Sequence, residues 1–145
     1  MEKCKIIIDT NLWISLLIGK RLSEMRNLCN SKLISVYVCK ELISEFSRVS
    51  SLEKIRKYVS VSRVKETVNL MELSCINISI KHISVLSNLR DDKDLFLLSL
   101  ADTIQADYIL TGDKDLLTLQ FHNQTKIVTY NEFIELQQAV DSDFE

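Results

Sequence analysis

Short apolar runs alternate with longer amphipathic stretches along the whole chain. The apolar runs predict strands buried on both faces, at residues 4–8, 34–38, 76–80, 107–111 and 126–129. Between them, helical spacing of apolar residues predicts helices over 11–18, 21–30, 40–49, 53–73 with a break, 94–105, 114–119 and 131–139. Strands that alternate with helices in this way indicate an α/β fold built on a parallel sheet.

The chain shows no sign of an internal boundary. It has no proline, two glycines and no low-complexity tract, so its 145 residues predict one domain over residues 1–140, with 141–145 as a frayed tail. Its 46% hydrophobic and 26% charged residues are ordinary for a soluble protein, and no apolar run reaches the length of a membrane span. Without a signal-peptide pattern or a CxxC pair, the chain is expected to be cytoplasmic, with no membrane partner.

Acidic residues follow four of the five predicted strands. The acids are Asp9 after the first strand, Glu41 and Glu45 after the second, Asp91, Asp92 and Asp94 downstream of the third, and Asp113 and Asp115 after the fourth. In an open parallel sheet the carboxyl ends of the strands share one edge, where ligands bind. Carboxylates gathered there repel one another unless a cation lies among them. The pattern therefore predicts a divalent-metal site for phosphoryl transfer.

Each acidic cluster taken alone also has a structural explanation. Asp9 and Asp113 can cap the helices that follow them, and the acids at 91–94 suit the first turn of a helix. Glu41 and Glu45 lie four residues apart on one helical face, and we prefer Glu45 as the site residue because Leu42 and Phe46 flank it. The joint occurrence of acids after four strands favours a site over four separate caps.

Charge is distributed unevenly along the chain, although the net charge is only −2. Residues 1–73 carry 13 Lys and Arg against 8 Asp and Glu, whereas residues 74–145 carry 5 against 12. The stretch 48–65 holds six cationic residues and Glu53 as its sole acid. Such a stretch suits a polyanion that must approach carboxylates, but for this run taken alone we favour a solvated helical face.

Other chemistries find little support in the sequence. The nucleotide-binding patterns GxGxxG and GxxxxGK[ST] do not occur, and neither GxSxG nor a Cys/His pairing indicates a covalent nucleophile. His82 and His122 stand isolated, so we assign neither to metal binding nor to general-base work.

Four segments together resemble PIN-domain proteins, and most nearly the toxin component of bacterial toxin–antitoxin pairs. The segments are Ile7-Ile8-Asp9-Thr10-Asn11, Glu41-Leu42-Ile43-Ser44-Glu45, Arg90-Asp91 through Asp94 with Leu98 and Ala101, and Ala106 through Leu116 with the sequence TGDKDL. They span residues 4 to about 138. The chain departs from the family at Asp92, where proline is common, and at Leu95, where an acid or amide is common.

The resemblance implies a three-layer α/β/α sandwich with a parallel sheet in the order 3-2-1-4-5. It implies endoribonuclease activity that depends on Mg²⁺ or Mn²⁺ and acts on single-stranded RNA. The catalytic and metal-binding acids that it implies are Asp9, Glu45, Asp94 and Asp113, with Asn11, Asp91, Thr111 and Asp115 as supporting residues.

The RNA backbone is then expected at the basic stretch, on Arg48, Lys54, Arg56 and Lys57. A cognate antitoxin is the expected protein partner, and a homodimer is left open. Two other functions also stay open: a PIN-fold module that binds RNA or protein with a weakened site, and another metal-dependent phosphohydrolase.

Overall fold

The computed structural model describes the backbone of residues 3–80 and 92–143, and their side chains except at 92–94 and 140–143. The strands are β1 (Cys4–Ile8), β2 (Ile34–Val38), β3 (Ile76–Asn77), β4 (Tyr108–Leu110), β5 (Phe121–His122) and β6 (Thr125–Val128). The helices are α1 (Thr10–Ile18), α2 (Leu22–Asn30), α3 (Lys40–Ser50), α4 (Glu53–Arg56), α5 (Val61–Ser74), α6 (Asp92–Ile104), α7 (Lys114–Leu119) and α8 (Tyr130–Asp143). Among the described residues, no helix is long and apolar enough to cross a membrane.

One sheet organises the fold, in the order β3-β2-β1-β4-β6-β5. The five predicted strands are all present, and their order and parallel pairing match the expected 3-2-1-4-5 arrangement. The sixth strand, β5, was not predicted: it pairs antiparallel with β6 and makes the sheet mixed. Its two residues are too few to leave a pattern, and Asn123, at φ 53°, turns the chain between the two strands.

The third strand is shorter than predicted for a physical reason. It covers two residues rather than five, and Ile76 is 42% exposed at the edge of the sheet. Because β3 pairs with β2 alone, only one side of its backbone is held, although the Ile78 N–H still donates to the Val38 carbonyl at 2.9 Å. The apolar run at 76–80 therefore predicted a longer strand than the structure contains.

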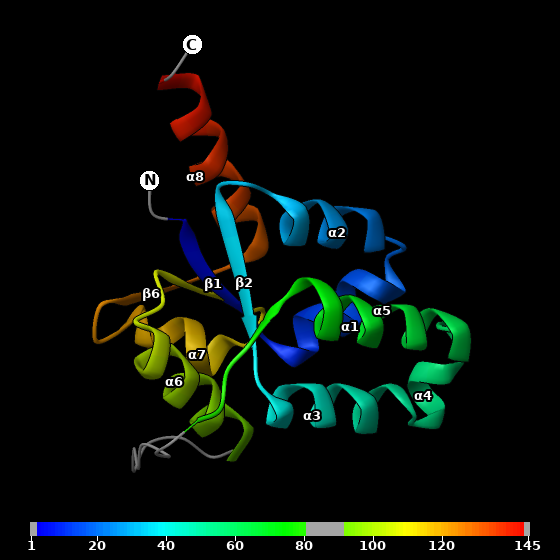
Figure 1. The fold of residues 1–145 in the computed structure, drawn as a ribbon. Helices are drawn as coiled ribbons and strands as arrows, with labels where there is room; N and C mark the ends of the chain where they lie inside the picture. Colours follow the sequence, from blue (N-terminus) through cyan, green and yellow to red (C-terminus); the bar gives the residue numbers. More distant parts are fainter. Residues whose placement is uncertain (1–2, 81–91, 144–145) are drawn as a thin grey trace.

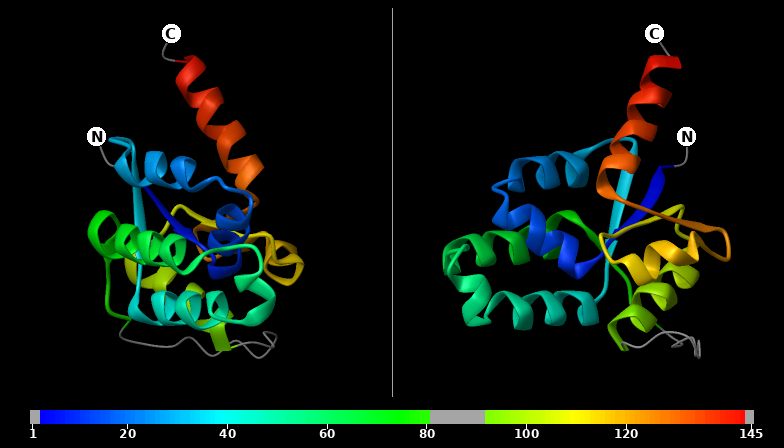
Figure 2. Two further views of the ribbon diagram at one scale, coloured as in Figure 1. Left: turned by 90° about the vertical axis from the view of Figure 1, so that its right-hand side faces the viewer. Right: turned by 180° about the vertical axis from the view of Figure 1, so that it is seen from behind.

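Helices cover both faces of the sheet, which confirms the three-layer arrangement. α1 to α5 lie on one side and α6 and α7 on the other, while α8 extends away from the body of the molecule (Figures 1 and 2). The isoleucines of β1 are fully buried, as expected for a central strand, and Leu97, Leu98 and Ala101 of α6 are buried too. The core therefore fixes β1 and α6, the elements that begin or end at the predicted acidic edge.

Candidate active site

Asp9 lies at the end of the central strand and is only 2% exposed. It occupies the N-cap position of α1, yet its side chain makes no capping hydrogen bond. Instead, one carboxylate oxygen, Oδ2, accepts a hydrogen bond of 2.8 Å from the Thr111 hydroxyl. Helix capping therefore does not explain this buried acid, whose burial is costly unless its charge is balanced.

Thr111 connects the ends of two neighbouring strands. Its hydroxyl donates to Asp9 and also accepts a hydrogen bond of 3.0 Å from the Asp113 N–H, and the residue is fully buried. Its own N–H donates to the Val128 carbonyl of β6 at 3.0 Å. Thr111 thus fixes the position of the Asp9 carboxylate relative to the turn that carries Asp113.

Asp113 is half-buried and begins α7. Its Oδ1 accepts a hydrogen bond of 2.8 Å from the Asp115 N–H, so this acid caps its helix. The helix-capping role considered for Asp113 from the sequence is therefore confirmed. It also lines a cleft of about 230 Å³ together with Asn11, Leu12, Ser15 and Gly112. Asp115 is exposed. The cleft joins the start of α1 to the turn after β4, beside the Asp9–Thr111 pair.

The helix α3 presents its two glutamates on one half-buried flank. Leu42, Phe46 and Ser50 form its buried stripe, and α3 packs against both α1 and α6. The Glu45 carboxylate accepts from both nitrogens of the Arg48 fork, at 2.7 and 3.3 Å, and this pairing raises the pKa of the Arg48 guanidinium. Arg48 is therefore engaged by a predicted site residue.

Glu41 differs from Glu45 in its surroundings. Its Oε1 is buried and has no hydrogen-bond partner among the described residues. Burial, with a further contribution from the nearby charge of Glu41, raises the pKa of the Cys39 thiol to about 11, so this thiol stays protonated at neutral pH. Each glutamate thus has a distinct environment on the same flank.

The two glutamates can be separated by matched substitutions. If the chain cleaves RNA with a bound metal ion, as the resemblance of its sequence implies, Glu45→Gln should reduce cleavage roughly 10- to 100-fold, the usual effect of losing a group that supports a metal site. Glu41→Gln should have a much smaller effect, because only one of the two carboxylates is expected to reach the metal. Cleavage rates at saturating Mg²⁺ compare them, and the reverse ranking would assign the role to Glu41.

The third acidic cluster is described only in part. Asp94 lies in the first turn of α6, whose buried leucines hold the helix against the sheet, but its side chain lies outside the described residues, and so does Asp91 altogether. Within the described part of the chain, no group of three or more His, Cys, Asp or Glu is close enough to hold a metal ion. The prediction that Asp94 is a metal ligand concerns a side chain outside the described part of the chain.

The donor chemistry of the cleft fits Mg²⁺ or Mn²⁺. The side chains at this edge offer carboxylate, amide and hydroxyl oxygens, from Asp9, Asn11, Ser15 and Asp113. Hard oxygen donors are what these two cations prefer, and Mg²⁺ needs few protein ligands because it retains several waters. Ser15 was not predicted from the sequence, although its position four residues after Asn11 puts both on one helical face.

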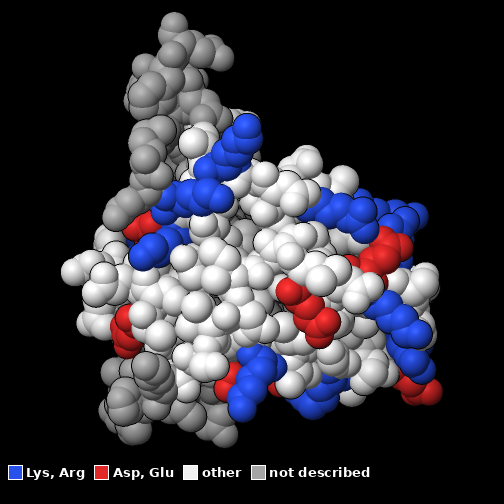
Figure 3. Space-filling view, in the orientation of Figure 1, with Lys and Arg blue, Asp and Glu red and all other residues white. Residues whose placement is uncertain are grey.

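The basic residues at 54–57 lie on and just after α4, at the end of α3 farther from β1 (Figure 1). Lys54 and Arg56 on α4, and Lys57 after it, are exposed. Figure 3 shows Lys and Arg at the right of the view, where α4 and α5 lie in Figure 1, and also at the upper left and along the lower edge, with acidic side chains among them. The basic stretch therefore lies at a solvent-accessible end of the layer that α1 and α3 share.

Comparisons with known proteins agree with this architecture. A family model described as PIN domain matches residues 5–115. An uncharacterized protein of Methanocaldococcus jannaschii is 29% identical over 92% of this chain and 91% of its own length. The solved PIN domain of T. brucei RRP44 superposes with a TM-score of 0.56 at 16% identity, covering 98% of this chain and 85% of that one, which shows a shared fold.

Proposed function

Because the chain belongs to the PIN domain family, whose fold is of nuclease type, we propose that it is a metal-dependent endoribonuclease acting on single-stranded RNA. The observation that carries the proposal is the buried carboxylate of Asp9, held by Thr111 beside the Asp113 cleft rather than used as a helix cap. A buried acid in a fixed orientation at a sheet edge is suited to binding a cation.

In this proposal Asp9, Asp94 and Asp113 hold Mg²⁺ or Mn²⁺, and Glu45 completes the site. When bound, such an ion balances the charge of a phosphodiester and makes water a better nucleophile. Thr111 orients Asp9, because its hydroxyl hydrogen is committed to Oδ2. Asn11 and Ser15, which face the cleft, are placed to donate hydrogen bonds to phosphate oxygens.

The proposed substrate is a polyanion, and cationic side chains outside the acidic site have to balance its negative charge. We assign its backbone contacts to Lys54, Arg56 and Lys57, which are exposed. Arg48 also holds Glu45, through Nε and Nη2, and because its side chain is 65% exposed it stays assigned to the RNA backbone as well. A sequence-tolerant electrostatic contact of this kind suits single-stranded RNA.

A cleavage assay tests the proposal directly. Purified protein is incubated with single-stranded RNA, double-stranded RNA and a simple phosphate diester, each with Mg²⁺, Mn²⁺ or EDTA. Cleavage of single-stranded RNA that EDTA abolishes is the expected result. Hydrolysis of the simple ester without RNA cleavage would identify a different phosphohydrolase, and RNA binding without cleavage a binding module.

We further propose that this activity is that of a toxin, held in check by an antitoxin protein in the cytoplasm. The support is the resemblance of the acidic motifs to toxin-type members of the family. Induced expression in bacteria should arrest growth with the wild-type chain and not with Asp9→Asn at equal protein level. Growth curves with matched immunoblots measure this, and equal growth in both strains would contradict a toxin role.

A further inference from the structure

A second cavity, of about 540 Å³, lies at the opposite end of α1 from the acidic cleft. Buried Leu17, Leu22 and Val59 contribute its apolar lining, and Lys20, Tyr58 and Arg63 contribute cationic and aromatic groups. Within the described part of the chain, no acidic side chain lines it. Its chemistry is therefore cationic and aromatic, the reverse of the acidic cleft.

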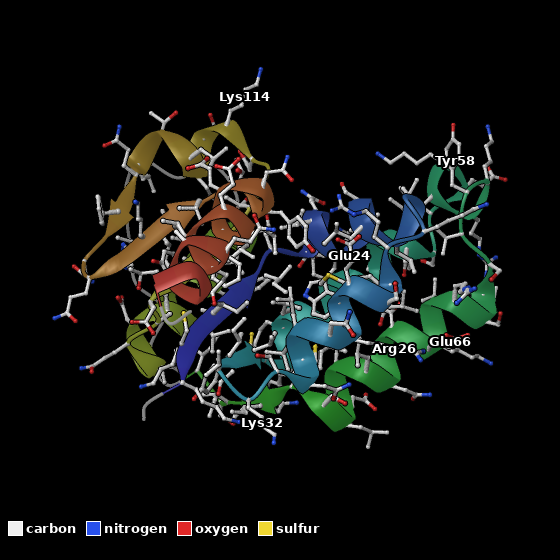
Figure 4. The ribbon with its side chains drawn as sticks, turned by 90° about the horizontal axis from the view of Figure 1, so that it is seen from above. Glu24, Arg26, Lys32, Tyr58, Glu66 and Lys114 are labelled. Atoms are coloured by element: carbon white, nitrogen blue, oxygen red, sulfur yellow. The ribbon has the colours of Figure 1, made fainter. Side chains whose placement is uncertain are left out.

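Tyr58 is the most exposed aromatic residue of the described chain, at 69%. It projects outward from the connection between α4 and α5 (Figure 4). Base stacking needs such an accessible ring, and neighbouring cations then meet the phosphates, the combination found in sequence-tolerant single-strand binding. The three basic residues of the α4 region precede it directly in the chain.

Two cations, Lys20 and Arg63, line the same cavity as the Tyr58 ring. Arg63 lies 3.5 Å from the Glu66 carboxylate, which also accepts a shorter bond of 2.9 Å from Arg26, so a single acid serves two guanidinium groups. Lys20 is exposed, and among the described residues that line the cavity there is no acid to offset its charge.

The backbone of Lys20 is in the left-handed conformation. The chain reverses after α1 with the Lys20 N–H bonded to the Leu17 carbonyl and the Arg21 N–H to the Leu16 carbonyl, a turn whose left-handed position is usually glycine. Here Gly19 has φ −74°, and Lys20 takes the left-handed φ of 59°. A lysine thus occupies the left-handed position of this turn, where a glycine would be less strained.

From this juxtaposition we infer that the cavity at Tyr58, Lys20 and Arg63 binds one nucleotide of a single-stranded RNA, with its base stacked on Tyr58 and its phosphate on the two cations. The inference rests on RNA being the ligand of the proposed function, but not on cleavage. α1 and α3 pack together and lead from the acidic edge to this end (Figure 1). From Asn11 to Leu17 the helix rises about 9 Å.

Binding of a fluorescent twelve-nucleotide single-stranded RNA, measured by anisotropy in the Asp9→Asn background, tests the inference without cleavage. Tyr58→Ala and Tyr58→Leu should weaken binding roughly 5- to 100-fold, and Tyr58→Phe should retain it, because stacking needs a ring and not merely apolar area. Phe121→Ala, which removes another exposed aromatic at the β5 edge, is the matched control and should leave the Kd unchanged.

The contribution of Lys20 to RNA binding is tested by the salt dependence of the binding constant. Lys20→Gln should reduce the slope of log K against log salt by about 0.7, the value of one single-strand phosphate contact. Lys32→Gln, which removes an exposed lysine far from Tyr58 in Figure 4, should change it less. Thermal melting confirms that each variant is folded.

Unchanged affinity in Tyr58→Ala, or equal slopes for the two lysine variants, would overturn the inference even if the wild type cleaves RNA. If Tyr58→Ala weakens RNA binding in a protein that never cleaves RNA, the inference is supported and the nuclease proposal is refuted. Equal affinity of Tyr58→Leu and wild type would also overturn it, since the surface would then recognise apolar area, as a protein partner does.

Discussion

Replacing Asp9 by Asn is expected to reduce metal-dependent RNA cleavage by roughly 100- to 1000-fold, the range found when a charge-stabilising group is removed from an active site. Asn has nearly the same shape and keeps an oxygen that can accept the Thr111 hydrogen bond. The variant loses the negative charge and little of the packing. Initial rates on single-stranded RNA at saturating Mg²⁺ measure the effect.

Two controls separate this loss from misfolding or from a general charge effect. The melting temperature of Asp9→Asn should equal or exceed that of the wild type, because a buried charge has been removed. Glu135→Gln, an exposed acid of α8, removes the same charge elsewhere and should leave cleavage unchanged. Full activity in Asp9→Asn would exclude Asp9 from the site, whatever the behaviour of the controls.

Mn²⁺ is expected to raise the melting temperature of the wild type by roughly 5–10 °C. A ligand that binds only the folded state stabilises it by about 2.7 kcal/mol at a hundredfold excess over Kd, and about 2–4 °C follows from each kcal/mol in a domain near this size. Relief of repulsion among carboxylates at the sheet edge is the physical source. Melting curves recorded across a Mn²⁺ series give the size of the rise.

Asp94→Asn tests whether the α6 acid takes part in that response. The variant loses one ligand and one repelling charge, so its metal-free form should melt no lower than the wild type while its rise with Mn²⁺ shrinks. If Asp94 only caps the helix, Asn can still cap and the full rise should persist. Calcium- and magnesium-free buffer with EDTA provides the baseline for both proteins.

Hydrophobic periodicity predicted most of this fold because most strands are central. β1, β2 and β4 are each paired on both sides, so buried runs mark them clearly. The edges were less predictable, because an edge strand is held on one side only. That is why β3 ended early at Asn77 and the two-residue β5 left no pattern.

The sequence predicted which acidic residues lie at the candidate site, but not the hydrogen bonds that hold them. Strand ends indicated Asp9 and Asp113, but only the structure shows that Asp113 caps its helix while Asp9 does not. The hydrogen bond from Thr111 to Asp9 joins residues 102 apart in the chain, which no local pattern encodes. Likewise, the Arg48–Glu45 pairing makes a residue predicted for RNA contact a partner of the site itself.

The order of the strands also governs when the active site can exist during folding. β1 is made first, yet the residue that orients its carboxylate belongs to β4's end, more than a hundred residues later. Contacts of such long sequence separation form late, since the chain between them must first be ordered. A partly synthesised or partly folded chain therefore lacks an oriented Asp9, so the proposed nuclease activity should begin only after β1 and β4 have paired.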